Sequence, residues 1–209
     1  MTTDNLLISL FNDINNCLLK DQKPSEYLSS IINKPEFNKP PFNLIKKLRF
    51  TEQSPKYHPE GNVWNHTLLV VDEAAKIKNK SSDEKAFMWA AFLHDLGKPD
   101  TTRNRMGKIT SYDHDKVGAE LTEDFLFKFI DDKEFISRVV CLVRFHMQIL
   151  YVVKDLPYKD IHAINSSNLI TDIALLGYCD RMGRKGADKQ EEQKNIEMFY
   201  KKCKEKEGK

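Results

Sequence analysis

Glycine is scarce in this sequence, and segments that would indicate β-strands are missing. Eight glycines occur in 209 residues, and no convincing series of alternating apolar and polar residues is present. No apolar run approaches the ~20 residues needed to cross a bilayer. The N-terminus lacks the basic region, apolar segment and small-residue cleavage site of an export signal. We therefore expect an all-α protein of the cytoplasm that has no membrane partner.

Paired cysteines and a strong net charge are also absent. The four cysteines lie far apart and form no CxxC motif, so we interpret them as reduced thiols rather than a disulfide framework: Cys17, Cys141, Cys179 and Cys203. The formal net charge of +2 gives no strong overall attraction to nucleic acid. DNA is therefore not an expected partner.

Three regions follow from the distribution of prolines and apolar residues. We expect a helical extension at residues 1–55, a main domain at 56–190 and a charged helix or tail at 191–209. The extension should contain three helices, at Asp4–Lys20, Pro24–Ile32 and Phe42–Thr51. The segment Gln53–Gly61 contains two prolines and a glycine, which indicates a loop at the boundary.

The main domain should contain a central, fully buried helix. The residues Ser81-Ser82-Asp83-Glu84 fit a capping box, and Ala86–Leu93 is apolar on every side. Gly97 as a C-cap and Pro99 beyond it would end this helix. This pattern predicts that His94 and Asp95 lie at the end of a buried helix, where a pocket can form.

Other helices of the main domain are expected on both sides of this one. We predict helices that begin near Asn65, run from Asp113 as N-cap to Ile130, and span Lys133–Val153 and Leu169–Arg184. Asn104–Ser111 should be a polar loop, Leu156–Ser167 has no clear pattern, and Lys189–Lys206 is either a charged helix or a frayed tail.

The His94–Asp95 doublet has possible partners along the rest of the chain. Neutral imidazoles and carboxylates hold hydrolytic metals, and positions on separate helices can converge in a bundle. The candidate ligands are His66, His94, Asp95, His114, His146 and Asp180. A carboxylate has two oxygens, so Asp95 could bridge two metals. Lys98 lies one turn beyond His94, where its cation could bind a phosphate oxygen.

Each candidate also has an interpretation without a metal. Asp180 belongs to an inward stripe with Ile173, Leu176 and Gly183, and Arg181 or Arg184 could satisfy its buried charge. A single histidine such as His114 or His146 is more often a hydrogen-bonded core or surface residue than a ligand. His58 either lines the pocket or only shapes its turn, and we interpret His162 as structural.

The ordered set resembles the HD superfamily of metal-dependent phosphohydrolases. The hallmark of that superfamily is a histidine, then a His-Asp doublet, then a distal aspartate, and here these are His66, His94-Asp95 and Asp180. The resemblance runs from about Tyr57 to Lys185 and implies an all-α HD bundle. It also implies that these four residues bind a first metal, and that His114 and His146 correspond to the additional ligands of dinuclear members.

Several strings resemble more specifically the HD domain of bacterial multifunctional tRNA nucleotidyltransferases: Tyr57-His58-Pro59-Glu60-Gly61-Asn62-Val63-Trp64-Asn65-His66-Thr67, Ala91-Phe92-Leu93-His94-Asp95-Leu96-Gly97-Lys98-Pro99, Asp113-His114-Asp115-Lys116-Val117-Gly118-Ala119 and Asp180-Arg181-Met182-Gly183-Arg184. That domain is associated with 2′,3′-cyclic phosphodiesterase, 2′-nucleotidase and phosphatase activity. No nucleotidyltransferase motif precedes the HD region here, so CCA addition is not expected.

The leading hypothesis is an enzyme that hydrolyses a phosphomonoester or a 2′,3′-cyclic phosphodiester with metal-activated water. Its substrate would be a small nucleotide or an RNA-terminal phosphate. Asp95 would orient or deprotonate the water, and the phosphate would contact Lys98, His58, Arg144 and Arg184. The cofactor would be one or two ions of Mn, Fe, Co, Ni or Zn per chain. The alternatives are a nucleotide- or RNA-binding HD module without turnover and a purely structural helical protein.

Overall fold

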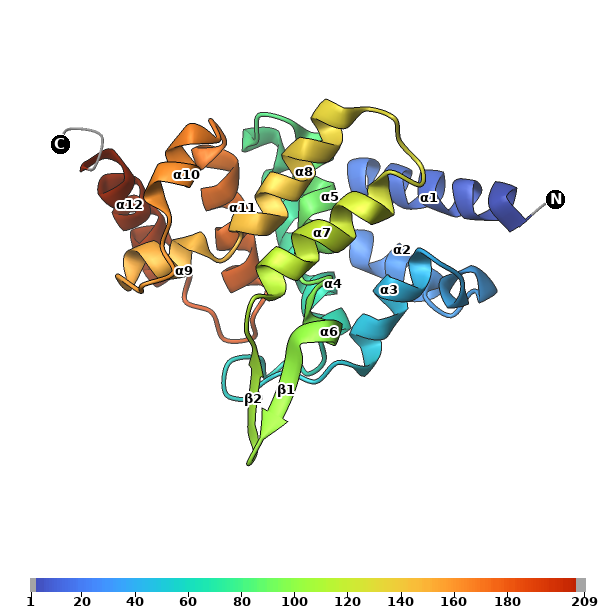
Figure 1. Cartoon of the computed structure of the whole chain (residues 1–209), viewed down its shortest axis with the longest axis horizontal. Helices are drawn as coiled ribbons and strands as arrows, with labels where there is room; N and C mark the ends of the chain where they lie inside the picture. The colour runs from blue at the N-terminus through green and yellow to red at the C-terminus, as the bar shows by residue number, and fades with distance from the viewer. Residues whose placement is uncertain (1–2, 206–209) are drawn as a thin grey trace.

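The computed structural model describes residues 3–205 and confirms the all-α class (Figure 1). Residues 1–2 and 206–209, which include the end of the expected charged tail, lie outside the described residues. The first half of the chain contains α1 (Thr3–Lys20), α2 (Pro24–Ile31), α3 (Phe42–Lys47), α4 (Val63–Ile77), α5 (Glu84–Leu93) and α6 (Lys98–Thr101). The second half contains β1 (Thr102–Arg105), β2 (Lys108–Ser111), α7 (His114–Leu126), α8 (Lys133–Phe145), α9 (Gln148–Val153), α10 (Ile161–Ser166), α11 (Ile170–Met182) and α12 (Lys189–Glu205).

Helix α5 lies at the centre of the bundle. Every residue from Ala86 to Leu93 is buried, and α1, α4, α8 and α11 all contact this helix. The side chain of Asp83 caps its N-terminus by accepting a hydrogen bond from the Ala86 N–H at 2.9 Å. Because α5 is apolar on every side, packing on all sides is the arrangement that hides its surface from water.

The expected end of this helix at Gly97 is wrong in detail. The α-helix ends at Leu93 and His94 is its C-cap, whereas Gly97 has a right-handed backbone and Pro99 lies in the first turn of α6. Pro99 therefore lies in the first turn of a new short helix that begins at Lys98, because its fixed φ suits a first turn. His94 and Asp95 still lie at the end of a buried helix, as predicted.

The N-terminal helices share the core of the bundle. Leu10, Ile14 and Leu18 of α1 are buried. Phe11 stacks on Trp89 of α5 with ring centroids 4.6 Å apart, and the Trp89 indole donates a hydrogen bond to Asn15. The buried apolar residues of the N-terminal helices and of the later helices belong to one continuous hydrophobic cluster.

The expected polar loop at Asn104–Ser111 is wrong, because this segment belongs to a β-hairpin. Strands β1 and β2 pair antiparallel, with Arg105 opposite Lys108. Met106 and Gly107 form the turn, and both have positive φ, at 50° and 78°. Two-residue hairpin turns need this backbone. The sequence signal is weak because methionine stands where asparagine or aspartate is usual. The hairpin projects from the bundle (Figure 1).

The predicted helix at Lys133–Val153 is two helices. Helix α8 ends at Phe145, and α9 begins at Gln148. At the break, His146 is the C-cap of α8. The change of direction lets α9 lie against α11, where Ile149 packs close to Gly177. Similarly, α7 ends at Leu126 and not at Ile130, and its N-cap Asp113 makes no side-chain capping bond.

The C-terminal residues described here form a packed helix. Helix α12 buries Phe199 against α9 and α11, so Lys189–Glu205 is the charged helix of the two alternatives. Helix α11 carries Asp180 on an inward face with Ile173, Leu176 and Gly183, as the sequence predicted. Within residues 3–205, no helix combines the length and apolar character needed to cross a membrane.

Candidate metal centre

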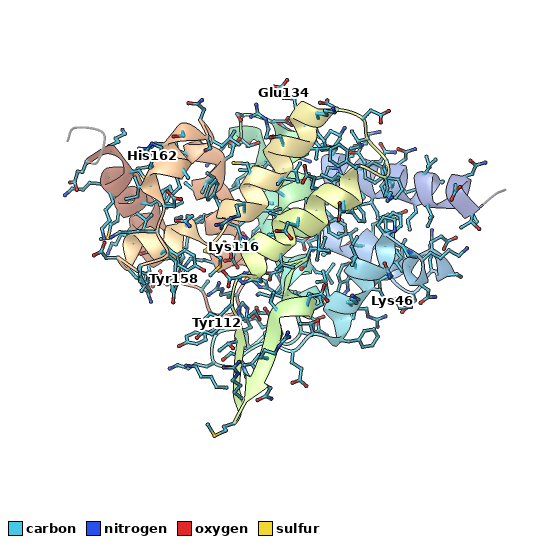
Figure 2. All side chains as sticks on the ribbon, viewed as in Figure 1. Lys46, Tyr112, Lys116, Glu134, Tyr158 and His162 are labelled. Carbon is cyan, nitrogen blue, oxygen red and sulfur yellow. The ribbon has the colours of Figure 1, made fainter. Side chains whose placement is uncertain are left out.

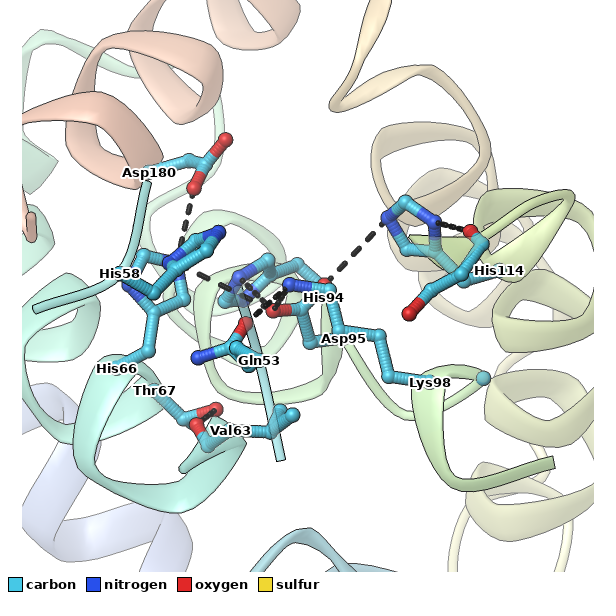
Figure 3. A network of polar contacts seen from close by, with 12 residues as sticks. Gln53, His58, Val63, His66, Thr67, His94, Asp95, Lys98, His114 and Asp180 are labelled. Carbon is cyan, nitrogen blue, oxygen red and sulfur yellow. Dashed lines mark hydrogen bonds and ion pairs between the residues drawn. The ribbon is translucent and has the colours of Figure 1, made fainter. Parts of the chain in front are cut away.

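Five elements bring the six candidate ligands into one buried cluster. These residues are His66 on α4, His94 and Asp95 after α5, His114 at the start of α7, His146 after α8 and Asp180 on α11. Figure 3 shows His66, His94, Asp95, His114 and Asp180 of this cluster. All six are buried. Asp95 lies between the other ligands, and its two carboxylate oxygens face different neighbours.

The first half of the cluster contains His66, His94 and Asp180, next to the Oδ2 atom of Asp95. His66 Nε2 lies 2.9 Å from Asp180 Oδ1 and 4.0 Å from Asp95 Oδ2. His94 Nε2 lies 3.2 Å from the same Asp95 oxygen. This half therefore combines two imidazoles with two carboxylates.

The second half contains His114 and His146, next to the Oδ1 atom of Asp95. The two Nε2 atoms lie 3.2 Å from each other, and they lie 3.6 and 3.9 Å from Asp95 Oδ1. Two nitrogen ligands at about 2.1 Å from one tetrahedral ion are roughly 3.4 Å apart. The observed nitrogen spacing is thus close to that of two ligands on a shared ion.

Hydrogen bonds fix the orientation of three of the imidazoles. The Nδ1 atoms of His94, His114 and His146 lie 2.9, 2.7 and 2.6 Å from backbone carbonyl oxygens three residues earlier in the chain. A carbonyl only accepts, so each Nδ1 carries the proton and donates it. Each Nε2 of a neutral ring then holds a lone pair that faces the cluster, which is the arrangement of a metal-ligating histidine.

His66 has a carboxylate on both sides. Its Nδ1 lies 2.9 Å from Glu60 Oε1, and its Nε2 lies 2.9 Å from Asp180 Oδ1. A neutral imidazole has one proton for these two contacts, so one nitrogen faces a carboxylate oxygen with lone pair against lone pair. A cation beside Nε2 removes that repulsion and leaves the proton on Nδ1, which faces Glu60.

The donor set fits a divalent transition metal. His94 Nε2 is buried and has no hydrogen-bond partner among residues 3–205, and the lone pairs of His114 and His146 face each other. Buried polar atoms without partners are costly, so the arrangement calls for a cation. Imidazole with carboxylate is the ligand chemistry of Mn, Fe, Co, Ni and Zn.

Electrostatics differ between the histidines. Burial lowers the pKa of His94, but the Asp95 carboxylate outweighs burial and the net direction is upward. Burial, together with His114 and His94, lowers the pKa of His146 to about 3, and burial also lowers the pKa of His114. Burial opposes ionisation of Asp95, yet His94 and Lys98 hold the pKa of this carboxyl well below its usual range.

Two glycines let the helices that carry the ligands approach closely. A Cβ atom on Gly97 would lie 2.2 Å from the carbonyl oxygen of His114, and one on Gly183 would lie 2.7 Å from Val70 Cγ2. Gly97 thus permits the contact between the Asp95 turn and α7. Gly183 permits the contact between α11 and α4, which holds Asp180 beside His66.

Lys98 contacts the central carboxylate. Its Nζ lies 2.7 Å from Asp95 Oδ2 and donates a hydrogen bond to Gln53 Oε1 at 2.6 Å. Both Lys98 and Asp95 line a cleft of about 1070 Å³ that opens over the cluster. The sequence predicted Lys98 as a phosphate contact, and the structure places its cation at the floor of this cleft.

The other predicted substrate contacts also line the cleft. His58 lies 2.9 Å from Glu60, Arg184 lies 3.1 Å from Asp180, and Arg144 pairs with Asp115. The ion pair with Arg184 is one of the partners that the sequence offered for Asp180, and it coexists with the His66 contact. Arg181 pairs instead with Glu192. His162 is outside the cleft lining.

Three residues of the site were missed by the sequence reasoning: Glu60, Gln53 and Asp115. Glu60 is buried, contacts both His58 and His66, and has its pKa lowered to about 2, because burial is outweighed by hydrogen bonds from His66 and other groups. Its position in a Pro-Glu-Gly turn suggested only a loop. Gln53 had no signal, whereas Asp115 is visible as the acid next to His114.

The fold and the site define an all-α bundle with a buried His/Asp cluster that could hold a divalent metal. The HD domain family matches residues 63–197, which is more than half of the chain. The chain therefore belongs to the HD domain family, as its order of histidines and aspartates indicated. The HD domain family belongs to the superfamily of metal-dependent phosphohydrolases.

Curated relatives match only over part of their length. The CC-adding tRNA nucleotidyltransferase of Thermus thermophilus is 30% identical over 129 residues, which cover 61% of this chain and 29% of that protein. The multifunctional CCA protein of Pasteurella multocida is 37% identical over 89 residues, which cover 42% of this chain and 21% of that protein. The A-adding tRNA nucleotidyltransferase of Deinococcus radiodurans is 31% identical over 105 residues, which cover 49% of this chain and 24% of that protein. The chain spans less than a third of these relatives.

Proposed function

We propose that this protein is a metal-dependent phosphohydrolase with a dinuclear centre. The observation that carries the proposal is Asp95, whose two oxygens face two separate sets of histidine nitrogens. The first half of the centre would hold one ion through His66, His94, Asp95 and Asp180. Its second half would hold another through Asp95, His114 and His146.

The substrate we propose is a nucleotide-type phosphomonoester or a 2′,3′-cyclic phosphodiester. A cleft of about 1070 Å³ has room for such a molecule, because ligand pockets usually measure about 300–1,000 Å³. Cationic side chains line the cleft next to the cluster, as a phosphate requires: Lys98, Arg144 and Arg184.

The chain's own residues divide the chemical work. A bound divalent ion supplies a Lewis acid that polarises phosphoryl oxygens and makes water more acidic. Asp95 has a strongly lowered pKa, so it is ionised at neutral pH and can orient a water proton at its carboxylate. Lys98 would bind a phosphate oxygen from the floor of the cleft and offset the charge that develops in the transition state. Glu60 and the backbone carbonyls keep the imidazoles oriented.

The cellular setting we propose is the cytoplasm. The four cysteines form no disulfide among the described residues, and Cys17 and Cys179 are buried thiols. Burial raises the pKa of Cys17 to about 12. Such thiols suit a reducing compartment.

The test combines metal analysis with a substrate panel. Protein stripped by a chelator is reloaded separately with Mn, Fe, Co, Ni or Zn and assayed on 2′,3′-cyclic nucleotides and on 2′-, 3′- and 5′-nucleoside monophosphates. We expect metal-dependent release of phosphate, or opening of the cyclic diester. Bound metal with no turnover across the panel would reject the hydrolase and favour the binding module.

A pair of variants assigns that activity to the centre. Asp95→Ala should abolish hydrolysis while circular dichroism shows a folded helical protein, because the substitution removes the carboxylate between both halves. Asp100→Asn changes an exposed acid nearby and should leave turnover unchanged. Near-normal turnover in folded Asp95→Ala would reject the role of Asp95.

A further inference from the structure

The β-hairpin is an exposed basic arm beside the cleft. Residues 102–112 contain three cations and no acidic residue. Arg103, Arg105 and Lys108 are all exposed, and Met106 at the turn is fully exposed. No ion-pair partner of Arg105 or Lys108 occurs in the part of the chain that the structure describes. The arm therefore offers positive charge to an external group.

The register gathers these cations on one face of the hairpin. Arg103 pairs with Thr110, and Arg105 pairs with Lys108. Directly opposed residues point to the same side, and side chains two apart along a strand share a face. All three cations thus share a face with Thr110, which lines the cleft. These three cations form a basic track along the arm, and Thr110 on the same face joins the arm to the cleft lining.

This arrangement is unfavourable for the hairpin alone. Like charges directly opposed across two strands destabilise the pair. Arg105 and Lys108 form such a pair at the solvent-exposed end of the arm, where folding gains nothing from it. A polyanion that binds along this face would compensate for the repulsion.

Exposed aromatic rings line the cleft near the arm. Tyr57, Tyr112 and Tyr158 are 58, 68 and 63% exposed, and all three line the cleft. Figure 2 shows Tyr112 beside the hairpin and Tyr158 on the same side of the molecule. Nucleic-acid bases stack on such rings when they are not paired. Rings together with a basic track favour a single strand over a mononucleotide or an acidic protein.

We propose that the hairpin binds the phosphate backbone of a single-stranded nucleic acid, with the strand's end in the cleft and its bases on the exposed tyrosines. The placement of the end rests on the proposed hydrolase function, whereas the binding of the strand does not. The substrate class would then extend from mononucleotides to the terminal phosphate of an oligonucleotide.

Strand binding is measured by fluorescence anisotropy with labelled 12-nucleotide probes that end in a hydroxyl group. The probes are a single-stranded RNA, DNA of the same sequence, and the RNA annealed to its complement. We expect at least one single strand to bind about tenfold more tightly than the duplex, with affinity that falls as salt rises. The RNA and DNA probes show which sugar is preferred. Equal binding of the duplex and the single strands would overturn the proposal.

Charge reversal locates the binding face. Arg105→Glu with Lys108→Glu should weaken binding at least tenfold. It should also reduce the slope of log affinity against log salt by about 1.4, since each phosphate contact on a single strand contributes about 0.7. Lys128→Glu with Lys133→Glu makes the same charge change after α7 and at the start of α8, and should leave binding within about twofold. Equal losses of affinity in both variants would overturn the assignment of strand binding to the hairpin.

Two further measurements distinguish the contributions of base stacking and of hydrolysis from the contribution of the hairpin's positive charge. Tyr112→Leu should weaken strand binding about tenfold with little change in the salt slope. The Arg105→Glu and Lys108→Glu variant should keep the hydrolysis of mononucleotides. Strand binding without any hydrolysis would refute the proposed function and leave the arm standing, whereas mononucleotide hydrolysis without strand binding would refute the arm alone.

Discussion

The two halves of the candidate metal centre share Asp95 but differ in charge. The first half has the carboxylates of Asp180 and Glu60 against His66, and the pKa of His94 there is raised. The second half has two histidines with lowered pKa values, whose Nε2 atoms face the carboxylate of Asp95, while the nearby Asp115 is paired with Arg144. The first half therefore keeps an excess of negative charge, because its three carboxylates outnumber Lys98 and Arg184, whereas the second half presents neutral nitrogen atoms.

Because of this difference, we expect the two halves to bind metal with unequal affinity. Coulomb attraction to several carboxylates favours a divalent ion in the first half. The second half depends on nitrogen lone pairs and on one oxygen of Asp95, so it should fill later and lose its ion sooner.

The largest effect should come from removing the charge of Asp180, the carboxylate ligand that belongs to the first half alone. Asp180→Asn should lower turnover about 1,000-fold, because a loss of several kcal/mol of metal-dependent stabilisation amounts to about three powers of ten. Steady-state kinetics and metal analysis measure it. Asp172→Asn is a matched control, since Asp172 is also buried on α11 but binds Ser82. It should lower stability and retain metal; an equal loss of metal in both variants would contradict the assignment.

The second half should depend on the close approach of the Asp95 turn to α7. Gly97→Ala places a methyl group against the His114 carbonyl and should destabilise the protein by about 3 kcal/mol, in the range of overpacked cores. Chemical denaturation measures this loss, and metal titration should show that the weaker ion is lost first. Gly107→Ala is the control for backbone strain without overlap, because its φ is 78° and nothing lies within 4 Å of its added methyl, so it should cost only about 1–2 kcal/mol. A Gly97→Ala protein as stable as this control would contradict the account.

Orientation of the imidazoles can be changed by mutation in the first half. Glu60→Gln keeps the size of the side chain but removes the charge that faces His66 Nδ1, and should weaken metal binding about 10- to 100-fold. Competition with a chelator of known affinity measures the change. His94, His114 and His146 are oriented by backbone carbonyls that no such substitution removes. Unchanged affinity in Glu60→Gln would show that Glu60 does not support the ligand.

The halves should respond to pH with opposite signs in the metal-free protein. The pKa of His146 is lowered to about 3, so the unfolded chain binds its proton first, and stability falls as pH falls from about 6.5 toward 3. The raised pKa of His94 adds stability that is present below about 6.5 and is lost as pH rises through the folded value.

Urea denaturation of the metal-free protein across pH tests these signs. Between pH 6.5 and 5, the contribution of His146 amounts to at most about 2 kcal/mol. His146→Gln should flatten the loss of stability below pH 6.5, whereas His94→Gln should remove a loss of stability that appears as pH rises above 6.5. The same change in slope for both variants would contradict the difference between the halves.

The sequence predicted those features that depend on order and periodicity. The buried character of Ala86–Leu93 placed His94 and Asp95 at the end of a central helix, and the inward stripe of α11 placed Asp180. The ordered set of histidines and aspartates identified the family before any geometry was known.

Features that depend on long-range contact could not be predicted in the same way. Glu60 is far from Lys185 in sequence, yet accepts a hydrogen bond from its backbone N–H and holds His66. The break at His146 reflects packing of α9 on α11, and the hairpin depends on the backbone of Met106. No periodic pattern reports these tertiary contacts.

The central claim is that Asp95 joins two metal-binding halves. The most direct measurement is metal stoichiometry under metal-replete conditions, for the natural chain and for the variant with His114→Ala and His146→Ala. The account predicts a decrease from about two ions per chain to about one, with loss of hydrolysis and a folded protein by circular dichroism. An unchanged stoichiometry in the double variant would contradict the account and leave only a mononuclear site.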